Sequence, residues 1–289
     1  MDFLFLLSAI CGWVYTLCWS ASFYPQALLN VRRRSTSGTT IDYPFINVLG
    51  FAAYLASSAA LLYSPTVRAQ YAARHHGLAP TVQLNDVLFA LHALVLSLIT
   101  ASQYFCAQSL WNFYPAPGTR PSRAMVGVAT GCVLAVLATY ALAAHAASSS
   151  YPLDPASAWC ELDVVYAAGY AKLLITLVKY TPQVVVNARA RSTVGWSISQ
   201  VVLDLVGGFL SLLQLALDSY RQHDWSGVSG NPVKLALGNA SMLYDSVFMV
   251  QHYVLYPHRA DAHWPDVEAP LLEAPRAPDA DLGRRRRLS

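Results

Sequence analysis

Apolar residues gather in seven long blocks that are separated by shorter polar stretches. Each block holds roughly 20 residues or more, the length of helix that crosses the hydrocarbon core of a bilayer. Because lipid offers no water to the backbone, a segment that spans it satisfies its own hydrogen bonds as a helix. The pattern predicts seven transmembrane helices, approximately at residues 3–29, 41–63, 85–110, 124–147, 159–187, 197–220 and 232–256.

The chain also contains an internal repeat. The stretch YPQALLNVRRRSTSG, which begins at Tyr24, matches TPQVVVNARARSTVG, which begins at Thr181, at a shift of 157 positions. The same register continues as far as Gly50 and Gly207 and beyond. Many transporters are built from two such halves. We therefore predict an all-α membrane protein with a first three-helix repeat (1–111), a linker helix (112–156), a second three-helix repeat (157–256) and a disordered tail (257–289).

The composition agrees with a membrane protein. Of 289 residues, 55% are hydrophobic and 12% are charged, about half the charge of a typical soluble domain. The first block has no basic region before it and leads directly into the repeat, so we interpret it as a retained helix and not as a cleaved signal peptide.

The distribution of lysine and arginine predicts the orientation, because cytosolic loops carry the excess of these residues. The loops after the first, third and fifth blocks are basic, and so is the C-terminal tail, whereas the opposite loops hold few such residues. This pattern predicts a luminal N-terminus and a cytosolic C-terminus. The net charge of +3 is then a signal of topology and not of a nucleic-acid partner, and the terminal run Arg284–Arg287 is suited to contact anionic membrane lipid.

Each repeat places a Pro-Gln pair near the end of its first helix. Pro25 and Pro182 remove a backbone hydrogen bond and are expected to bend these helices, so we interpret them as hinges. Gln26 and Gln183 then either face a polar cavity at the kink or bond to a neighbouring helix. Two interrupted helices at matching positions indicate a central binding site between the halves.

Ionisable residues inside the predicted spans are candidates for function. Lys172 and Lys179 are seven residues apart and share a helix face. Asp204 lies about two turns into the sixth block, where it is expected either to carry a proton part of the time or to pair with one of these lysines. Asn47 occupies the matching position of the first repeat, so that one half offers a titratable group and the other an amide.

Three further residues have both a structural and a functional interpretation. Asp86 is either an N-cap or an acidic group near the luminal end of the third helix. His92, deeper in the same helix, is either a buried neutral side chain or part of a proton relay. Asp245 is a second carboxylate within a span. His75 and His76, in the loop before the third helix, are expected to be solvated.

These residues together resemble the PQ-loop family of transporters, and within it the proton-coupled cystine exporters of lysosomes. The resemblance covers residues 4–256, has the 3+1+3 arrangement of PQ-loop and SWEET transporters, and is carried by the segments SFYPQ (22–26), NDV (85–87), LHA (91–93), VKYTPQ (178–183), STVGWSI (192–198), SLLQ (211–214) and QHY (251–253).

The resemblance implies export of L-cystine together with protons from the lumen of a lysosome or vacuole, with no cofactor. It implies that Asp204 is the central protonation site, and that Asp86, Asp245 and, on our interpretation, His92 take part in coupling. Gln200 stands where the family pattern has Asn. The substrate-binding residues that we predict are Gln26, Asn47, Lys172, Lys179, Tyr180, Gln183, Asn187 and Lys234.

Other classes of function remain open. A PQ-loop transporter of another substrate is the nearest alternative, although the lysines disfavour a cationic cargo and the two carboxylates disfavour a purely neutral sugar uniporter. A seven-helix receptor that transports nothing is a different class, which the repeated kinked helices disfavour. No nucleophile–base or metal-ligand spacing appears, and the five cysteines form no CxxC pair, so we predict no enzyme, no metal site and no structural disulfide.

Overall fold

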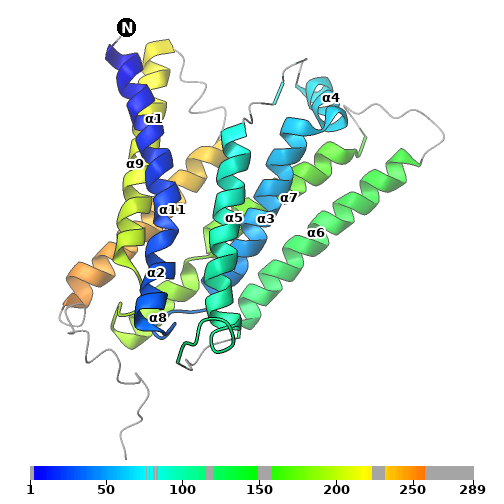
Figure 1. Cartoon of the computed structure of the whole chain (residues 1–289). Coiled ribbons are helices and arrows are strands. Elements are labelled where there is room, and N and C mark those ends of the chain that lie inside the picture. The colour runs from blue at the N-terminus through cyan, green and yellow to red at the C-terminus, as the bar shows by residue number, and fades with distance from the viewer. Residues whose placement is uncertain are drawn as a thin grey trace, which may run out of the picture.

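The computed structural model describes residues 3–75, 77, 79–80, 82, 84–114, 120–148, 158–222 and 232–257. The side chains of residues 5, 85, 215, 218–219, 221–222 and 232–238 lie outside this description, as does most of the expected C-terminal tail. The described residues form helices and connecting loops (Figure 1). The helices are α1 (Phe3–Ser22), α2 (Tyr24–Arg33), α3 (Asp42–Tyr63), α4 (Pro65–Arg74), α5 (Leu84–Phe105), α6 (Arg123–Ala147), α7 (Glu161–Val178), α8 (Thr181–Ala190), α9 (Ile198–Gln222), α11 (Pro232–Val250) and a short π-helix, η1 (Gln251–Leu255).

The two Pro-Gln pairs interrupt helices at matching positions, as the sequence predicts. α1 gives way to α2 immediately before Pro25, and α7 gives way to α8 immediately before Pro182. Proline is tolerated at the first positions of a helix, where its missing N–H has no partner to lose. α2 and α8 then both end at an arginine in the left-handed conformation, Arg34 with φ 46° and Arg191 with φ 47°.

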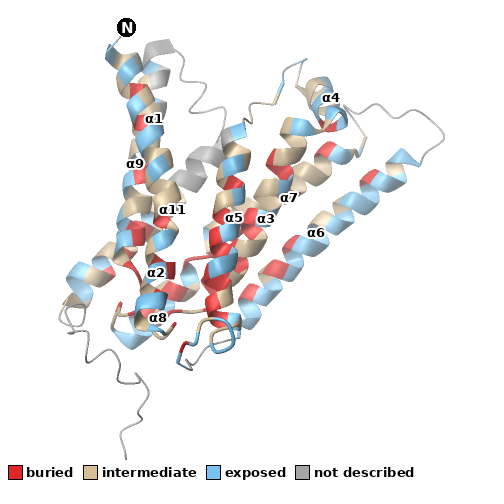
Figure 2. Ribbon diagram, viewed as in Figure 1, coloured by how far each residue is buried: buried red, intermediate tan, exposed pale blue. Residues whose placement is uncertain are grey.

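The two repeats are intertwined and do not lie apart as two separate bundles. α1 of the first repeat packs along α9 of the second, and α3 of the first packs along α7 of the second (Figure 1). α5 packs on α3, α11 packs on α9, and the linker helix α6 packs on α7. The loops of residues 34–41 and 191–197 lie at one end of the bundle, which we call the crossed-loop end. Buried side chains concentrate in the bundle centre toward that end (Figure 2).

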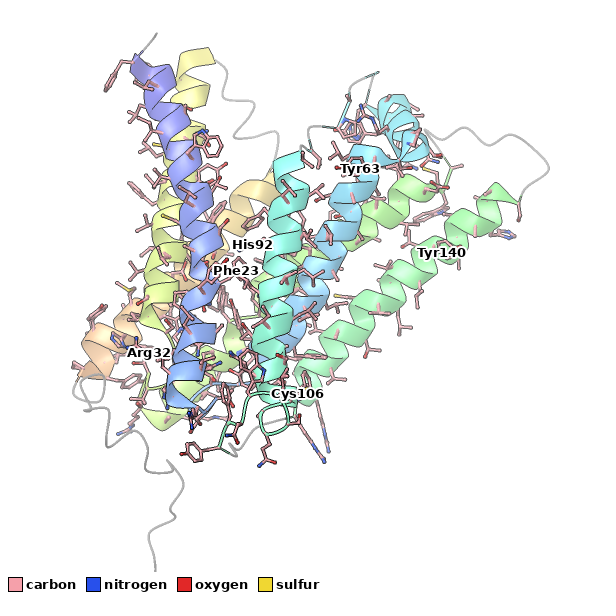
Figure 3. All side chains as sticks on the ribbon, viewed as in Figure 1. Phe23, Arg32, Tyr63, His92, Cys106 and Tyr140 are labelled. Atoms are coloured by element: carbon pink, nitrogen blue, oxygen red, sulfur yellow. The ribbon has the colours of Figure 1, made fainter. Side chains whose placement is uncertain are left out.

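Four segments of the described chain are long and apolar enough to cross a membrane: Leu6–Arg33, Asp42–Tyr63, Asp86–Phe105 and Arg123–Ala147. The helix α6 illustrates their character, because Leu134, Leu137 and Tyr140 are all exposed, and Figure 3 labels Tyr140. Apolar side chains on the outside of a bundle suit a lipid environment. The protein is therefore a multi-pass membrane protein, and the full set of seven spans remains a prediction.

One loop differs from the expectation. The segment between the second and third predicted spans contains α4, whose Arg74 donates through Nη2 to Asp163 Oδ2 of α7 at 2.8 Å. His75, which we expected to be solvated, stacks on Tyr71 and shares a hydrogen bond of 2.9 Å with Tyr166 of α7. That expectation was wrong for His75 because α4 brings it against a helix of the other repeat, and His76 lies outside the described residues.

Candidate functional site

The glutamine of the first Pro-Gln pair reaches across to the loop of the second repeat. Gln26 is 3% exposed, and its Nε2 donates to Gly195 O at 2.9 Å. Its Oε1 accepts from the backbone N–H of Ser197 at 2.8 Å. The same amide nitrogen also donates to Asn30 Oδ1, one turn along α2. Gln26 therefore ties α2 to the loop that precedes α9.

Gln183 makes the same contacts in reverse. Its Nε2 donates to Gly38 O at 3.2 Å, its Oε1 accepts from the N–H of Thr40 at 3.1 Å, and it also donates to Asn187 Oδ1. Each loop is thus held by the glutamine of the opposite repeat. We call the two loops crossed because of this reciprocal bonding. A hydrogen bond between two buried polar groups avoids the cost of leaving either of them unpaired.

A second glutamine in each repeat completes the network. Asn30 donates to Gln103 Oε1 of α5 at 2.8 Å, and Asn187 donates to Gln251 Oε1 of η1 at 3.1 Å. Gln103 and Gln251 in turn donate to backbone carbonyls of α2 and α8. The pattern of the first repeat is therefore reproduced in the second.

Two pairs of equivalent residues touch each other directly. Gly38 and Gly195 lie backbone to backbone where the loops cross, and a Cβ added to Gly195 would come to 3.1 Å from the Cα of Gly38. Gln200 Nε2 donates to the Tyr43 hydroxyl at 2.9 Å, and these two residues are 157 positions apart. Residues related by the repeat can meet only on the axis that relates its halves, so both contacts mark that axis.

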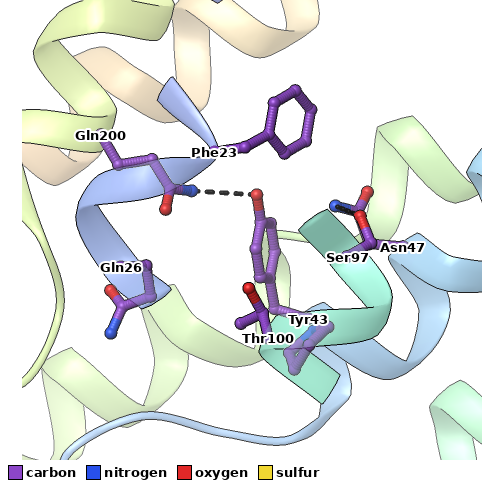
Figure 4. A pocket seen from close by; sticks show the side chains of 8 residues that line it. Phe23, Gln26, Tyr43, Asn47, Ser97, Thr100 and Gln200 are labelled. Carbon is purple, nitrogen blue, oxygen red and sulfur yellow. Dashed lines mark hydrogen bonds between the residues drawn. The ribbon is translucent and has the colours of Figure 1, made fainter. Parts of the chain in front are cut away.

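A small cavity opens beside the Tyr43–Gln200 contact (Figure 4). Two predicted substrate contacts, Gln26 and Asn47, help to line it. Asn47 donates to Ser97 Oγ of α5 at 3.3 Å, while its Oδ1 is buried without a protein partner in the described part of the chain. The full lining consists of Phe23, Gln26, Tyr43, Pro44, Asn47, Ser97, Thr100 and Gln200.

Asp204 accepts hydrogen bonds from two hydroxyl groups. Tyr180 donates to its Oδ2 at 2.8 Å, and Ser241 of α11 donates to the same atom at 3.0 Å. Within the described residues, the ion pair that forms is Arg74–Asp163, so Asp204 does not make the direct contact with Lys172 or Lys179 that we considered. The hydroxyl groups satisfy the carboxylate instead.

The two lysines lie against aromatic rings, of which Phe51 and Tyr43 belong to α3 and Tyr180 precedes α8. Lys172 Nζ is 3.6 Å from the centroid of the Phe51 ring. Lys179, which is 7% exposed, places Nζ 4.5 Å from the Tyr180 ring and 5.7 Å from the Tyr43 ring. Lys172 lies in α7 and Lys179 is the C-cap residue of that helix. Cation–π attraction stabilises an ammonium group that is removed from water.

The remaining candidates occupy different places. Asp245 is 1% exposed, and its Oδ2 has no hydrogen-bond partner among the described residues. His92 shares a hydrogen bond of 2.9 Å with the Tyr24 hydroxyl, and its ring meets that of Phe23 edge to face (Figure 3). Asp86 is in the first turn of α5. The side chain of Lys234 lies outside the described residues.

Several residues of the site had not been singled out from the sequence. Ser97 and Thr100 are ordinary on an apolar helix, and only the cavity shows that they face Asn47. Ser241 likewise gives no signal until α11 packs against α9. Gln200 was noted only as a departure from the family pattern, and its equivalence to Tyr43 under the repeat was an overlooked signal.

A sequence profile described as "PQ loop repeat" matches residues 7–67 and 164–224, which lie in the register of the internal repeat. The chain is 37% identical to cystinosin of Drosophila melanogaster over 260 residues, covering 90% of this chain and 61% of that protein. It thus spans about three fifths of the length of the animal relatives that it matches.

Two other relatives are covered almost completely. A cystinosin homolog of Arabidopsis thaliana is 34% identical over 271 residues, which are 92% of this chain and 93% of that protein. The cystine transporter of Saccharomyces cerevisiae is 27% identical over 272 residues, which are 92% of this chain and 99% of that protein.

Proposed function

Because this chain belongs to the cystinosin family of PQ-loop repeat proteins, we propose that it exports L-cystine from a lysosome or vacuole to the cytosol together with protons. The family is one of transport proteins and not of enzymes. The yeast relative that is named as a cystine transporter supports the choice of substrate. The proposal places the crossed-loop end and the C-terminus in the cytosol, following the distribution of arginine in the loops.

The observation that carries the proposal is the group of buried and half-buried polar and ionisable side chains at the centre of the bundle. Cystine bears an ammonium and a carboxylate at each end, so a site for it needs both signs of charge and neutral hydrogen-bonding groups. Lys179, Asp204 and Asn47 are such groups, and none of them is in an ion pair within the described residues. Tyr43 connects them, since it lines the cavity and its ring stacks on that of Tyr180.

The other substrate contacts that we propose require movement. Gln26, Gln183 and Asn187 have their amides committed to protein partners in this conformation. Gln26 already lines the cavity, but its amide is free for a substrate only when the crossed loops separate, and Gln183 and Asn187 need the same separation. Lys172, Tyr180 and Lys234 complete the set that the family resemblance implies.

For the coupling, we propose Asp204 as the central proton site. Its carboxylate lies inside the bundle, where an ionised group is costly unless it is satisfied, and protonation removes that charge. Asp86, Asp245 and His92 act as further groups on the proton path. When the site is neutral and holds cystine, the bundle can pass from the state open to the lumen to the state open to the cytosol, by bending at Pro25 and Pro182. A proton drives this change only if the two states bind it with different affinity.

Uptake of radiolabelled cystine into proteoliposomes tests the proposal, with and without an inward proton gradient at outer pH 5 and pH 7. We expect cystine flux that depends on the gradient. Absence of cystine flux in protein that is folded and correctly oriented would contradict the substrate assignment, and the same vesicles would then be tested with other amino acids. Cystine flux that does not depend on the gradient would support cystine as the substrate and contradict the proton coupling.

A further inference from the structure

The Tyr43–Gln200 hydrogen bond joins the two repeats on their axis. Both side chains are buried, at 7% and 5% exposure, and they come from the first turns of α3 and α9. The donor is the amide of one repeat, and the acceptor is the phenol of the other. The repeat relates Tyr43 and Gln200 to each other, so this bond occurs once. The contacts of Gln26 and Gln183 with the loops, in contrast, occur once in each repeat.

The bond lies in the wall of the cavity and is close along the chain to the crossed loops. Tyr43 and Gln200 both line the cavity (Figure 4). Thr40 and Ser197 lie in the crossed loops, three residues before Tyr43 and Gln200. Their backbone N–H groups donate to Gln183 of α8 and Gln26 of α2. A solute that moves along the axis from the cavity toward the crossed-loop end has to pass between Tyr43 and Gln200.

The surroundings fix the tyrosine ring, and its hydroxyl accepts from Gln200 across the axis. The Tyr43 ring stacks on Tyr180 at a centroid distance of 5.4 Å and 24° between planes, and it meets Trp196 edge to face. With the ring held by α8 and by the second crossed loop, rotation of Gln200 with α9 is the direct way to break the bond.

The length of the glutamine matters. An asparagine on the same backbone has one methylene fewer and would not bring its amide to the Tyr43 hydroxyl. The family pattern has Asn at this position, so the bond depends on the particular pair of residues in this chain.

We propose that Tyr43 and Gln200 form a gate that holds the cavity closed toward the crossed-loop end, and that this bond sets the population of the state open at that end. They are positioning residues, since they act on the balance between two conformations. The inference rests on the proposed function only in assuming that solute passes along the axis. A net hydrogen bond contributes about 0.5–1.5 kcal/mol, which corresponds to a change of about twofold to tenfold in the ratio of two states.

Spin labels at Arg32 and Arg189 test the gate. These two positions are equivalent, exposed and near the ends of α2 and α8. Labels attached through a ketone-bearing unnatural amino acid leave the five native cysteines in place. Pulsed electron spin resonance in nanodiscs then gives the distribution of distances across the crossed-loop end without any substrate.

We expect Tyr43→Phe and Gln200→Asn each to raise the long-distance population relative to the short one by about twofold to tenfold. The double variant should shift it no further than the larger single change, because both substitutions remove the same bond. Tyr104→Phe is the matched control, since it also deletes a buried hydroxyl, one that bonds to Thr39 within the same repeat. It should leave the distances unchanged.

Unchanged distances in both single variants, additive shifts in the double variant, or an equal shift in Tyr104→Phe would overturn the gate. A variant that unfolds is recognised by gel filtration, and Gln200→Asn retains the fold by keeping a polar amide at the site. Since the distances need no cystine, a shift in these variants together with no cystine flux would refute the proposed substrate and leave the gate standing.

Discussion

Gly38 and Gly195 lie against each other at equivalent positions of the two repeats, and both have positive φ angles, 87° and 98°. A Cβ added to either one would also collide with a backbone carbonyl oxygen of the opposite loop. Only glycine satisfies both the conformation and the close approach at this contact.

Replacing either glycine by alanine should therefore destabilise the crossed loops. We expect Gly38→Ala and Gly195→Ala each to cost at least about 2 kcal/mol, from the left-handed backbone and from the collision. For a chain of this size the melting temperature in detergent should fall by roughly 5 °C or more. Gly127→Ala in α6 is the control, because nothing lies within 4 Å of its added Cβ. If Gly38→Ala and Gly195→Ala lowered the melting temperature no more than Gly127→Ala does, the close contact between the loops would be contradicted.

The crossed glutamines lead to a second prediction. Gln26→Leu leaves Gly195 O and the N–H of Ser197 buried without this partner, and Gln183→Leu does the same to Gly38 and Thr40. Each should lower stability by about 2–4 kcal/mol, measured as thermal unfolding. Gln108→Leu replaces an exposed glutamine and should have little effect. If Gln26→Leu and Gln183→Leu have the same melting temperature as Gln108→Leu, the crossed loops are not held by these amides.

The proton coupling can be separated from transport itself. Asp204→Asn keeps an oxygen that accepts from Tyr180 but cannot bind a proton. We expect gradient-driven cystine accumulation to fall by more than about tenfold, while exchange of cystine at equal pH continues. Asp42→Asn is the control, because it makes the same chemical change at a buried carboxylate that does not line the cavity and accepts from the N–H of Ser122. Transport by this variant should still depend on the proton gradient. Accumulation that survives in Asp204→Asn would refute this proton site.

The ion pair between α4 and α7 should be insensitive to luminal acid. The hydrogen bond to the Asp163 carboxylate raises the pKa of Arg74 above its usual value. A raised pKa means that the stabilisation is complete below the ordinary pKa of an arginine and is lost only in strong base, as the pH rises through the higher value. On the acidic side the pair breaks when Asp163 takes a proton, and an ordinary aspartate does so near pH 4.

Arg74→Ala should accordingly lower stability by about 1–2 kcal/mol, and by the same amount at pH 5 as at pH 7. Thermal unfolding at the two pH values gives this comparison directly. Arg68→Ala, on the same helix, removes an exposed arginine that bonds to the local carbonyl of Leu62 and should cost less. A loss that appears only at pH 7 would show that the pair is already broken in acid.

Much of the fold could be predicted from the sequence. The apolar blocks, the breaks before Pro25 and Pro182, and the repeat all depend on local residue types and on spacing along the chain. α4 was missed because its ten residues are short and polar, and it is held by contacts with α7 that are far away in the sequence. The pairing of α1 with α9 and of α3 with α7 likewise leaves no local trace.

The site was predictable in its residue types and not in its connections. Gln26 and Gln183 were singled out correctly as polar groups at kinks, and bonding to a neighbouring element was one of the two interpretations. The interpretation named a neighbouring helix, whereas their partners lie in the loops of the opposite repeat, 169 and 145 positions away. The equivalence of Tyr43 and Gln200 was available from the repeat, but no pattern in either segment indicates that the two side chains meet.

The crossed loops also bear on how such a chain can arise. In a half-length protein with one Pro-Gln pair and one loop, two identical copies would make the same glutamine–loop contact twice, as an isologous dimer does. Joining the copies in one polypeptide keeps that contact and releases the two halves from identity. One half can then hold an amide at Asn47 while the other holds an acid at Asp204, an asymmetry that a homodimer encoded by one sequence could never possess.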